Sequence, residues 1–228
     1  MLKRLLSTAL LLTLTAAIAH AAARVPQVPV SGTALATFFA SQGQTIDVNN
    51  QQLDLQTMDL SSTPGFESHT FGTELNDTFG GYNTALAVPP LYQIVPGAIA
   101  TGWFSSTSFR TSPTRVVVSL FDNNAAFQGS TTYVSGPPDP STFGFYVQQP
   151  PAAGGTTFYT QDVRNTGGTA RILAYNATGS ANGWTWFACE TGAGPGGDYA
   201  DFIALVNLSL APVPVSRTDW GTLKRRFR

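Results

Sequence analysis

The segments Gly183-Trp-Thr-Trp-Phe-Ala-Cys-Glu190 and Asp198-Tyr-Ala-Asp-Phe-Ile-Ala-Leu-Val-Asn-Leu-Ser-Leu210 predict two β-strands joined by a glycine-rich turn. Both are rich in the aromatic and aliphatic residues that fit a pleated, buried surface. If the two strands pair, Glu190, Asp198 and Asp201 converge at the mouth of the connecting loop. This stretch therefore predicts both a β architecture and a candidate site.

Further strand candidates recur along the chain every 8 to 14 residues or so, separated by turns rich in proline, glycine and asparagine. The strongest is 114–121, in which Val116, Val118 and Leu120 share one face of the strand. The others are 45–48, 53–58, 99–109, 143–147, 156–160 and 171–175. Short, regularly spaced strands without a βαβ rhythm predict an all-β antiparallel sandwich or jelly-roll-like domain.

One short helix is expected near the N-terminus, over residues 33–42. Leu35, Phe38 and Phe39 fall at helical spacing there, and Gly43 supplies a stop.

The N-terminal end has the order of a secretory signal peptide. The basic start Lys3-Arg4 is followed by an apolar run and then by the small-residue site Ala19-His-Ala21, so residues 1–23 are expected to be removed. An uncleaved membrane anchor is the alternative. We therefore expect a secreted protein, extracellular or at the cell surface, with no transmembrane span after cleavage and with residues 24–211 as its β-sandwich domain.

A proline-linked basic tail follows the predicted domain, over residues 212–228. It combines one tryptophan with a cluster of bases: Trp220, Lys224, Arg225 and Arg226. The pattern indicates a C-terminal sorting or surface-attachment signal. The alternative is that the tail packs onto the acidic body of its own chain.

The body is acidic although the formal net charge of the whole chain is only -1. Between Arg24 and Ser216, five arginines stand against twelve carboxylates and there is no lysine, which gives a net charge of -7. Nucleic acid is therefore not expected as a partner, because phosphate binding needs clustered lysine and arginine.

Motifs for catalysis are absent from the sequence, so we expect a protein that is not an enzyme. Cys189, the only cysteine, lies among aromatic residues and is expected to be a buried small hydrophobe. His69, the only histidine after the signal, has no visible partner motif. A secreted hydrolase remains an alternative, since two carboxylates suffice for glycoside hydrolysis and the chain offers Glu67, Glu74, Asp162 and Glu190.

Carboxylates on a glycine-permitted loop suit a hard cation, and calcium takes six to eight oxygen ligands. Glu190, Asp198 and Asp201 would supply about four oxygens if one of them is bidentate. The alternative is structural: Asp198 caps the turn, Asp201 accepts main-chain N–H groups and Tyr199 fills the core.

Several motifs of the second half resemble a bacterial secreted β-domain family of unknown function, whose members often belong to exported proteins with PEP-CTERM sorting tails. The matching residues are Phe143-Gly-Phe-Tyr146, Thr157-Phe-Tyr-Thr-Gln-Asp162, Gly183-Trp184, Glu190, Asp198-Tyr199 and Asp201, within Leu91 to Leu210. The family signature is a Glu-Asp pair followed by Asp-x-Asp-Tyr-Asn-Asp. Here Thr191, Gly196 and Ala200 replace three of its polar residues, so the resemblance implies a weak or lost calcium site.

Aromatic side chains suggest a second kind of site, because exposed rings stack on sugars. Trp103, Trp184 and Trp186 are the candidates, and Trp184 and Trp186 are two residues apart on one strand face. The alternative is that these rings fill the core. The function expected from the sequence is thus a secreted, non-catalytic envelope or extracellular binding or structural module with a weak calcium site. A carbohydrate-binding adhesin, with a glycan or envelope component as its partner, is the runner-up.

Overall fold

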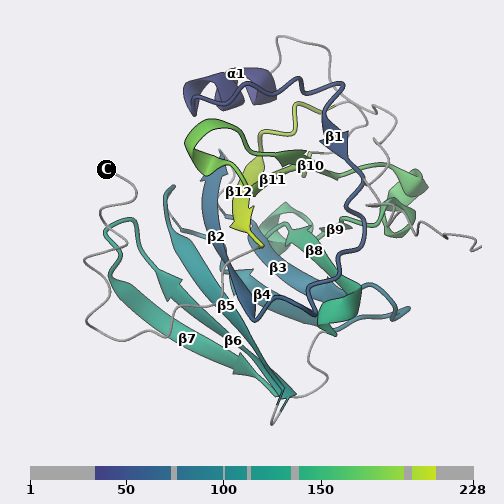
Figure 1. Ribbon diagram of the computed structural model, residues 1–228. Coiled ribbons are helices and arrows are strands. Elements are labelled where there is room, and N and C mark those ends of the chain that lie inside the picture. The colour runs from purple at the N-terminus through teal and green to yellow at the C-terminus, as the bar shows by residue number, and fades with distance from the viewer. Residues whose placement is uncertain are drawn as a thin grey trace, which may run out of the picture.

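The computed structural model describes residues 34–72, 76–99, 101–111, 114–134, 139–192 and 197–208. Within these ranges the chain forms two antiparallel sheets and one short α-helix (Figure 1). The predicted all-β sandwich with one N-terminal helix is therefore confirmed.

The larger sheet has eight strands in the order β1-β10-β11-β12-β2-β5-β6-β7. Every neighbouring pair in it is antiparallel. The strands are β1 Gln52–Leu53, β2 Gly65–Gly72, β5 Phe104–Thr111, β6 Thr114–Phe121, β7 Phe127–Tyr133, β10 Ile172–Asn176, β11 Thr185–Cys189 and β12 Phe202–Asn207.

The smaller sheet has four strands in the order β4-β3-β8-β9 and packs against the larger one. Its strands are β3 Thr78–Asn83, β4 Leu91–Val95, β8 Phe143–Gln148 and β9 Thr157–Tyr159. Short 3-10 turns connect the strands: η1 Pro140–Thr142, η2 Pro151–Ala153, η3 Asp162–Arg164, η4 Thr166–Gly168 and η5 Gly179–Ala181. The core between the sheets contains many phenylalanines, among them Phe66, Phe79, Phe145, Phe187 and Phe202.

A third layer covers part of the larger sheet on its outer face. Helix α1, Ala34–Ser41, lies over that face, as Figure 1 shows above β10, β11 and β12. Leu35 and Phe39 of the helix are buried in a second hydrophobic cluster with Tyr175, Trp186 and others. The strands β10, β11 and β12 are therefore buried on both faces, which explains their nearly continuous apolar sequence.

The hairpin predicted for residues 183–210 is present. β11 pairs with β12 in antiparallel register, from Thr185 opposite Val206 to Cys189 opposite Phe202. The strongest predicted strand, 114–121, is β6 with identical bounds, and the predicted helix is α1. Val116 and Val118 are buried between the sheets, and Leu120 is half-buried against the same cluster.

Two predicted strands are wrong. Residues 45–48 form no strand: Val48 and Ile46 instead pack in the cluster beneath α1, and that packing accounts for the alternation. In 53–58, only Leu53 belongs to a strand and Met58 makes a single bridge to Phe143. Strands β2, β3, β4 and β7 were not predicted, because glycine and polar residues interrupt or replace their apolar pattern.

The predicted signal peptide, residues 1–23, and the basic tail, residues 212–228, lie outside the described residues. The same holds for the tail candidates Trp220, Lys224, Arg225 and Arg226. In the described part of the chain, no helix has the length and apolar character needed to cross a membrane.

Candidate metal centre

The ends of β11 and β12 bring the three predicted carboxylates together. Glu190 follows the last residue of β11, and Asp201 precedes the first residue of β12, so the antiparallel register places them at the same end of the hairpin. One ligand oxygen from each of Glu190, Asp198 and Asp201 lies within 4.8 Å of the others. This acidic cluster could hold a metal ion.

Glu190 is the buried member of the cluster, with 6% of its surface exposed. Its carboxylate accepts main-chain N–H bonds from Gly192, at 2.8 Å, and from Tyr199, at 3.3 Å. A Cβ atom on Gly192 would lie 2.5 Å from Oε1, and one on Gly197 would overlap Oε2. The main chain thus approaches this carboxylate closely at both glycines, where a larger residue would force the Glu190 side chain to move.

Asp201 and Asp198 accept main-chain N–H bonds in the described segments on either side of residues 193–196. Asp201 Oδ2 accepts the N–H of Thr191 at 2.8 Å and that of Gly192 at 3.2 Å. Asp198 is exposed, and its Oδ1 accepts the N–H of Ala200 at 3.0 Å. These are the bonds expected if the acids shape the turn, so the carboxylates hold the loop and also converge on one point.

The electrostatics of the cluster disfavour its negative charge. Burial raises the pKa of the Glu190 carboxyl, and the nearby charge of Asp201 raises it further. The N–H bonds from Tyr199 and Gly192 act in the opposite direction but do not cancel this effect. A bound cation would remove the repulsion between the two carboxylates.

Tyr199, in the segment that leads into β12, has an uncommon main-chain conformation. Its φ is 54°, in the left-handed region that a bulky residue rarely adopts. The ring is buried, and its hydroxyl donates to the Ala170 carbonyl at 2.7 Å. Tyr199 is thus the core residue that the structural alternative expected, and it anchors the chain between Asp198 and Asp201.

Trp186 does not form a ligand-binding surface, contrary to its place among the glycan candidates. The residue is only 2% exposed and packs in the layer between α1 and the larger sheet. Its ring contacts those of Phe38, Phe39 and Phe71, and its Nε1 donates to Gln44 Oε1 at 3.3 Å. The sequence could not show that a helix covers this face.

The other two glycan candidates, Trp103 and Trp184, are half-buried. The Trp184 ring lies 5.4 Å from the His69 ring, and the Trp103 carbonyl accepts the N–H of Thr70 at 3.0 Å. Trp184 lies just before β11 and Trp103 just before β5, so both stand at strand ends of the larger sheet. Glycan binding through these two residues stays a prediction.

His69 has a partner that sequence reasoning missed. Its Nε2 lies 2.5 Å from Glu67 Oε1, two residues earlier on β2, and its ring stacks on Phe104. Alternation along a strand places residues i and i+2 on one face, and this spacing was the available signal. Cys189 lies apart from this pair, in the core between the sheets, where burial raises the pKa of its thiol.

No protein-family model matches this chain, and comparisons with curated proteins and with solved structures also found no match. The resemblance to the secreted β-domain family therefore stays a prediction.

Proposed function

We propose that the protein is a secreted, non-catalytic binding or structural module of the bacterial envelope or exterior, with a calcium ion bound by the β11–β12 loop. The observation that carries the calcium site is the convergence of Glu190, Asp198 and Asp201, with ligand oxygens within 4.8 Å of one another. Secretion and the non-catalytic role rest on the sequence patterns described above.

Calcium suits this donor set better than a transition metal does. All three side chains offer carboxylate oxygens, the ligands of hard cations, and neither sulfur nor imidazole belongs to the cluster. Three carboxylates leave part of the coordination shell to main-chain carbonyls and water, which favours a weak site of the extracellular kind. Such a site would add stability to a loop that carries repelling charges.

Calcium is expected to raise the midpoint of thermal unfolding of the purified protein. At a free concentration one hundred times the dissociation constant, binding would stabilise the fold by about 2.7 kcal/mol, or roughly 5 to 10 °C for a domain of this size. The measurement is a thermal melt in EDTA and again in millimolar calcium, with calorimetric titration for the affinity.

Asp198→Asn and Asp201→Asn should abolish this rise, because each keeps an oxygen acceptor for the loop N–H groups but removes a charge. Asp122→Asn is the matched control. Asp122 Oδ1 accepts the N–H groups of Asn124 and Ala126 in the β6–β7 turn, the same kind of contact, but Asp122 lies outside the cluster. Equal midpoints in EDTA and calcium would refute the calcium site.

The stability of the calcium-free protein is expected to fall as pH rises through the folded-state pKa of Glu190. This pKa lies above the ordinary value of 4.5, so the folded state binds a proton more tightly than the unfolded state between the two values. Urea denaturation in EDTA at several pH values measures the slope. Glu190→Gln should reduce this slope, because an amide does not titrate in this pH range; an unchanged slope would contradict this assignment.

A further inference from the structure

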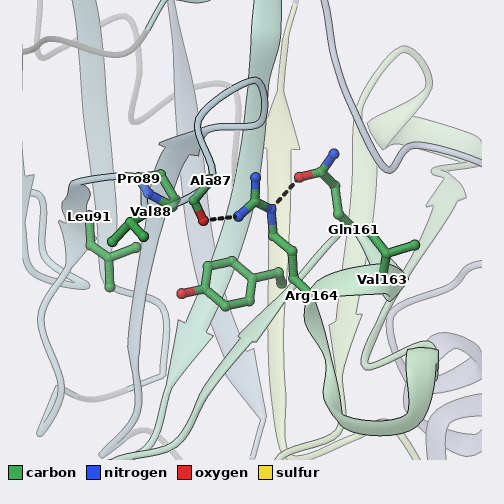
Figure 2. A pocket seen from close by; sticks show the side chains of 8 residues that line it. Ala87, Val88, Pro89, Leu91, Gln161, Val163 and Arg164 are labelled. Atoms are coloured by element: carbon green, nitrogen blue, oxygen red, sulfur yellow. Dashed lines mark hydrogen bonds between the residues drawn. The ribbon is translucent and has the colours of Figure 1, made fainter.

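A hollow of about 580 Å³ lies where the β3–β4 connection meets the segment that follows β9. Its volume falls in the range of small-ligand sites, and its lining combines polar and aliphatic groups. The aliphatic part of its lining is Val88, Pro89, Leu91 and Val163, seen on either side of Arg164 in Figure 2. This hollow is separate from the carboxylate cluster, because the two share no residue.

The Arg164 guanidinium is held rigidly at the hollow. Its Nη2 donates to the carbonyls of Thr84, at 3.0 Å, and Leu86, at 2.6 Å. Its Nη1 donates to the Ala87 carbonyl at 3.2 Å, and its Nε donates to Gln161 Oε1 at 2.5 Å. Figure 2 shows the guanidinium between Ala87 and Gln161. A positioned guanidinium loses little entropy when it binds a further acceptor.

The positive charge of Arg164 has no carboxylate partner within the described ranges, and no carboxylate lines the hollow. The rings of Tyr82 and Tyr159 lie 5.4 and 5.8 Å from the guanidinium carbon and offset only part of the charge. An arginine side chain has five N–H donors, and the bonds above use four. One N–H and most of the positive charge are left for a ligand.

The neighbouring polar groups are also donors. The Gln161 side-chain oxygen accepts from Arg164 and Tyr82, whereas its amide nitrogen has no protein partner in the described part of the chain. The Tyr159 hydroxyl, another lining group, likewise makes no hydrogen bond to described residues. Unused donors and a positive charge in one hollow fit an anionic acceptor, and the two oxygens of a carboxylate could accept from the remaining Arg164 N–H and from the Gln161 amide.

The apolar lining specifies the rest of the ligand. Val88 is 90% exposed and Val163 is 84% exposed, an unusual position for two valines beside one hollow. A ligand that carries its carboxylate next to a compact apolar group would contact both the guanidinium and these side chains. A long acyl chain would need a more enclosed cavity, because ligand sites usually bury most of their ligand.

We propose that this hollow binds the C-terminal carboxylate of a peptide that ends in an apolar residue. The carboxylate accepts from Arg164 Nη1 and Gln161 Nε2, and the terminal side chain covers Val88, Leu91 and Val163. This inference extends the proposed binding role and does not rest on the calcium site. Affinity should therefore be the same in EDTA and in calcium, so the two proposals fail separately.

The test compares N-acetyl-L-leucine with N-acetyl-L-leucinamide by NMR titration of the isotope-labelled protein. The two probes have the same side chain and differ in the carboxylate. The acid is expected to bind at least about tenfold more tightly, as a charge-assisted hydrogen bond implies. Equal affinity of acid and amide would overturn the proposal, and so would tighter binding of octanoate than of N-acetyl-L-leucine.

Charge variants at Val163 also test whether the hollow binds a carboxylate. They should not disturb the fold, since this side chain is almost fully exposed. Val163→Asp should weaken binding of the acid, and Val163→Lys should strengthen it, each by roughly two- to fivefold. The matched variants Val134→Asp and Val134→Lys, at an exposed site outside the hollow, should change nothing. Affinity that does not respond to the charge at residue 163 would refute the site.

Discussion

Phe145→Ala is expected to lower the free energy of unfolding by about 3–5 kcal/mol, as the deletion of a fully buried phenylalanine does. Phe145 is 0% exposed and belongs to β8, an inner strand of the smaller sheet. Its ring lies within 6 Å of those of Phe66, Phe79, Phe143 and Phe187, at 5.6, 5.0, 5.2 and 4.7 Å between centroids. Phe66 and Phe187 belong to the larger sheet, so the cavity would open between the two sheets.

Urea denaturation followed by circular dichroism measures this loss. Phe127→Ala is the matched control, because Phe127 is a phenylalanine on strand β7 that is 58% exposed. Its truncation should cost well under half as much, since most of its surface already contacts water. If the two variants lost similar stability, the assignment of Phe145 to the centre of the core would be wrong.

Trp186→Ala should lower the free energy of unfolding by a similar amount, about 3–5 kcal/mol, because it leaves a cavity between α1 and the larger sheet. The change removes ring contacts with Phe38 and Phe39 of the helix. It also leaves Gln44 Oε1 without the indole N–H that it accepts. The measurement is again urea denaturation, with limited proteolysis at the N-terminal side to detect release of the helix.

Trp184→Ala provides the comparison for this prediction. Trp184 is two residues away and half-buried, so its truncation should be much less costly than that of Trp186. A Trp184→Ala variant as unstable as Trp186→Ala would show that both rings belong to one core. Comparing the two variants therefore shows whether each tryptophan stabilises the core or is free for the ligand-binding role that was predicted for both residues.

Strands with continuous or alternating apolar residues could be predicted from the sequence, as β6, β11 and β12 show. Strand β3 could not, because Gly80 and Gly81 stand at its centre. A Cβ at Gly80 would collide with the Tyr92 carbonyl and the Tyr146 ring, so the glycine reflects close packing of neighbouring strands. The need for glycine at this position depends on residues that are distant in the sequence, so it leaves no periodic pattern in the local sequence.

The candidate site could be predicted from the sequence only in part. The convergence of Glu190 and Asp201 follows from the pairing of two recognisable strands. The conformation of Tyr199 and the contact between Glu67 and His69 require knowledge of side-chain packing. The hollow beside Arg164 joins segments more than 70 residues apart, from Thr84 to Arg164, and no motif marks either segment.

Because β11 and β12 have a covering layer on both faces, their hydrogen bonds are expected to open only when the whole domain unfolds cooperatively. The carboxylate loop is anchored at both ends in these two strands. Fraying of a loop anchored to a peripheral strand would release a ligand while the rest of the domain stays folded. Here the site between the two strand ends would be disrupted only when the whole domain unfolds, so the binding free energy of a ligand held there would add to global stability.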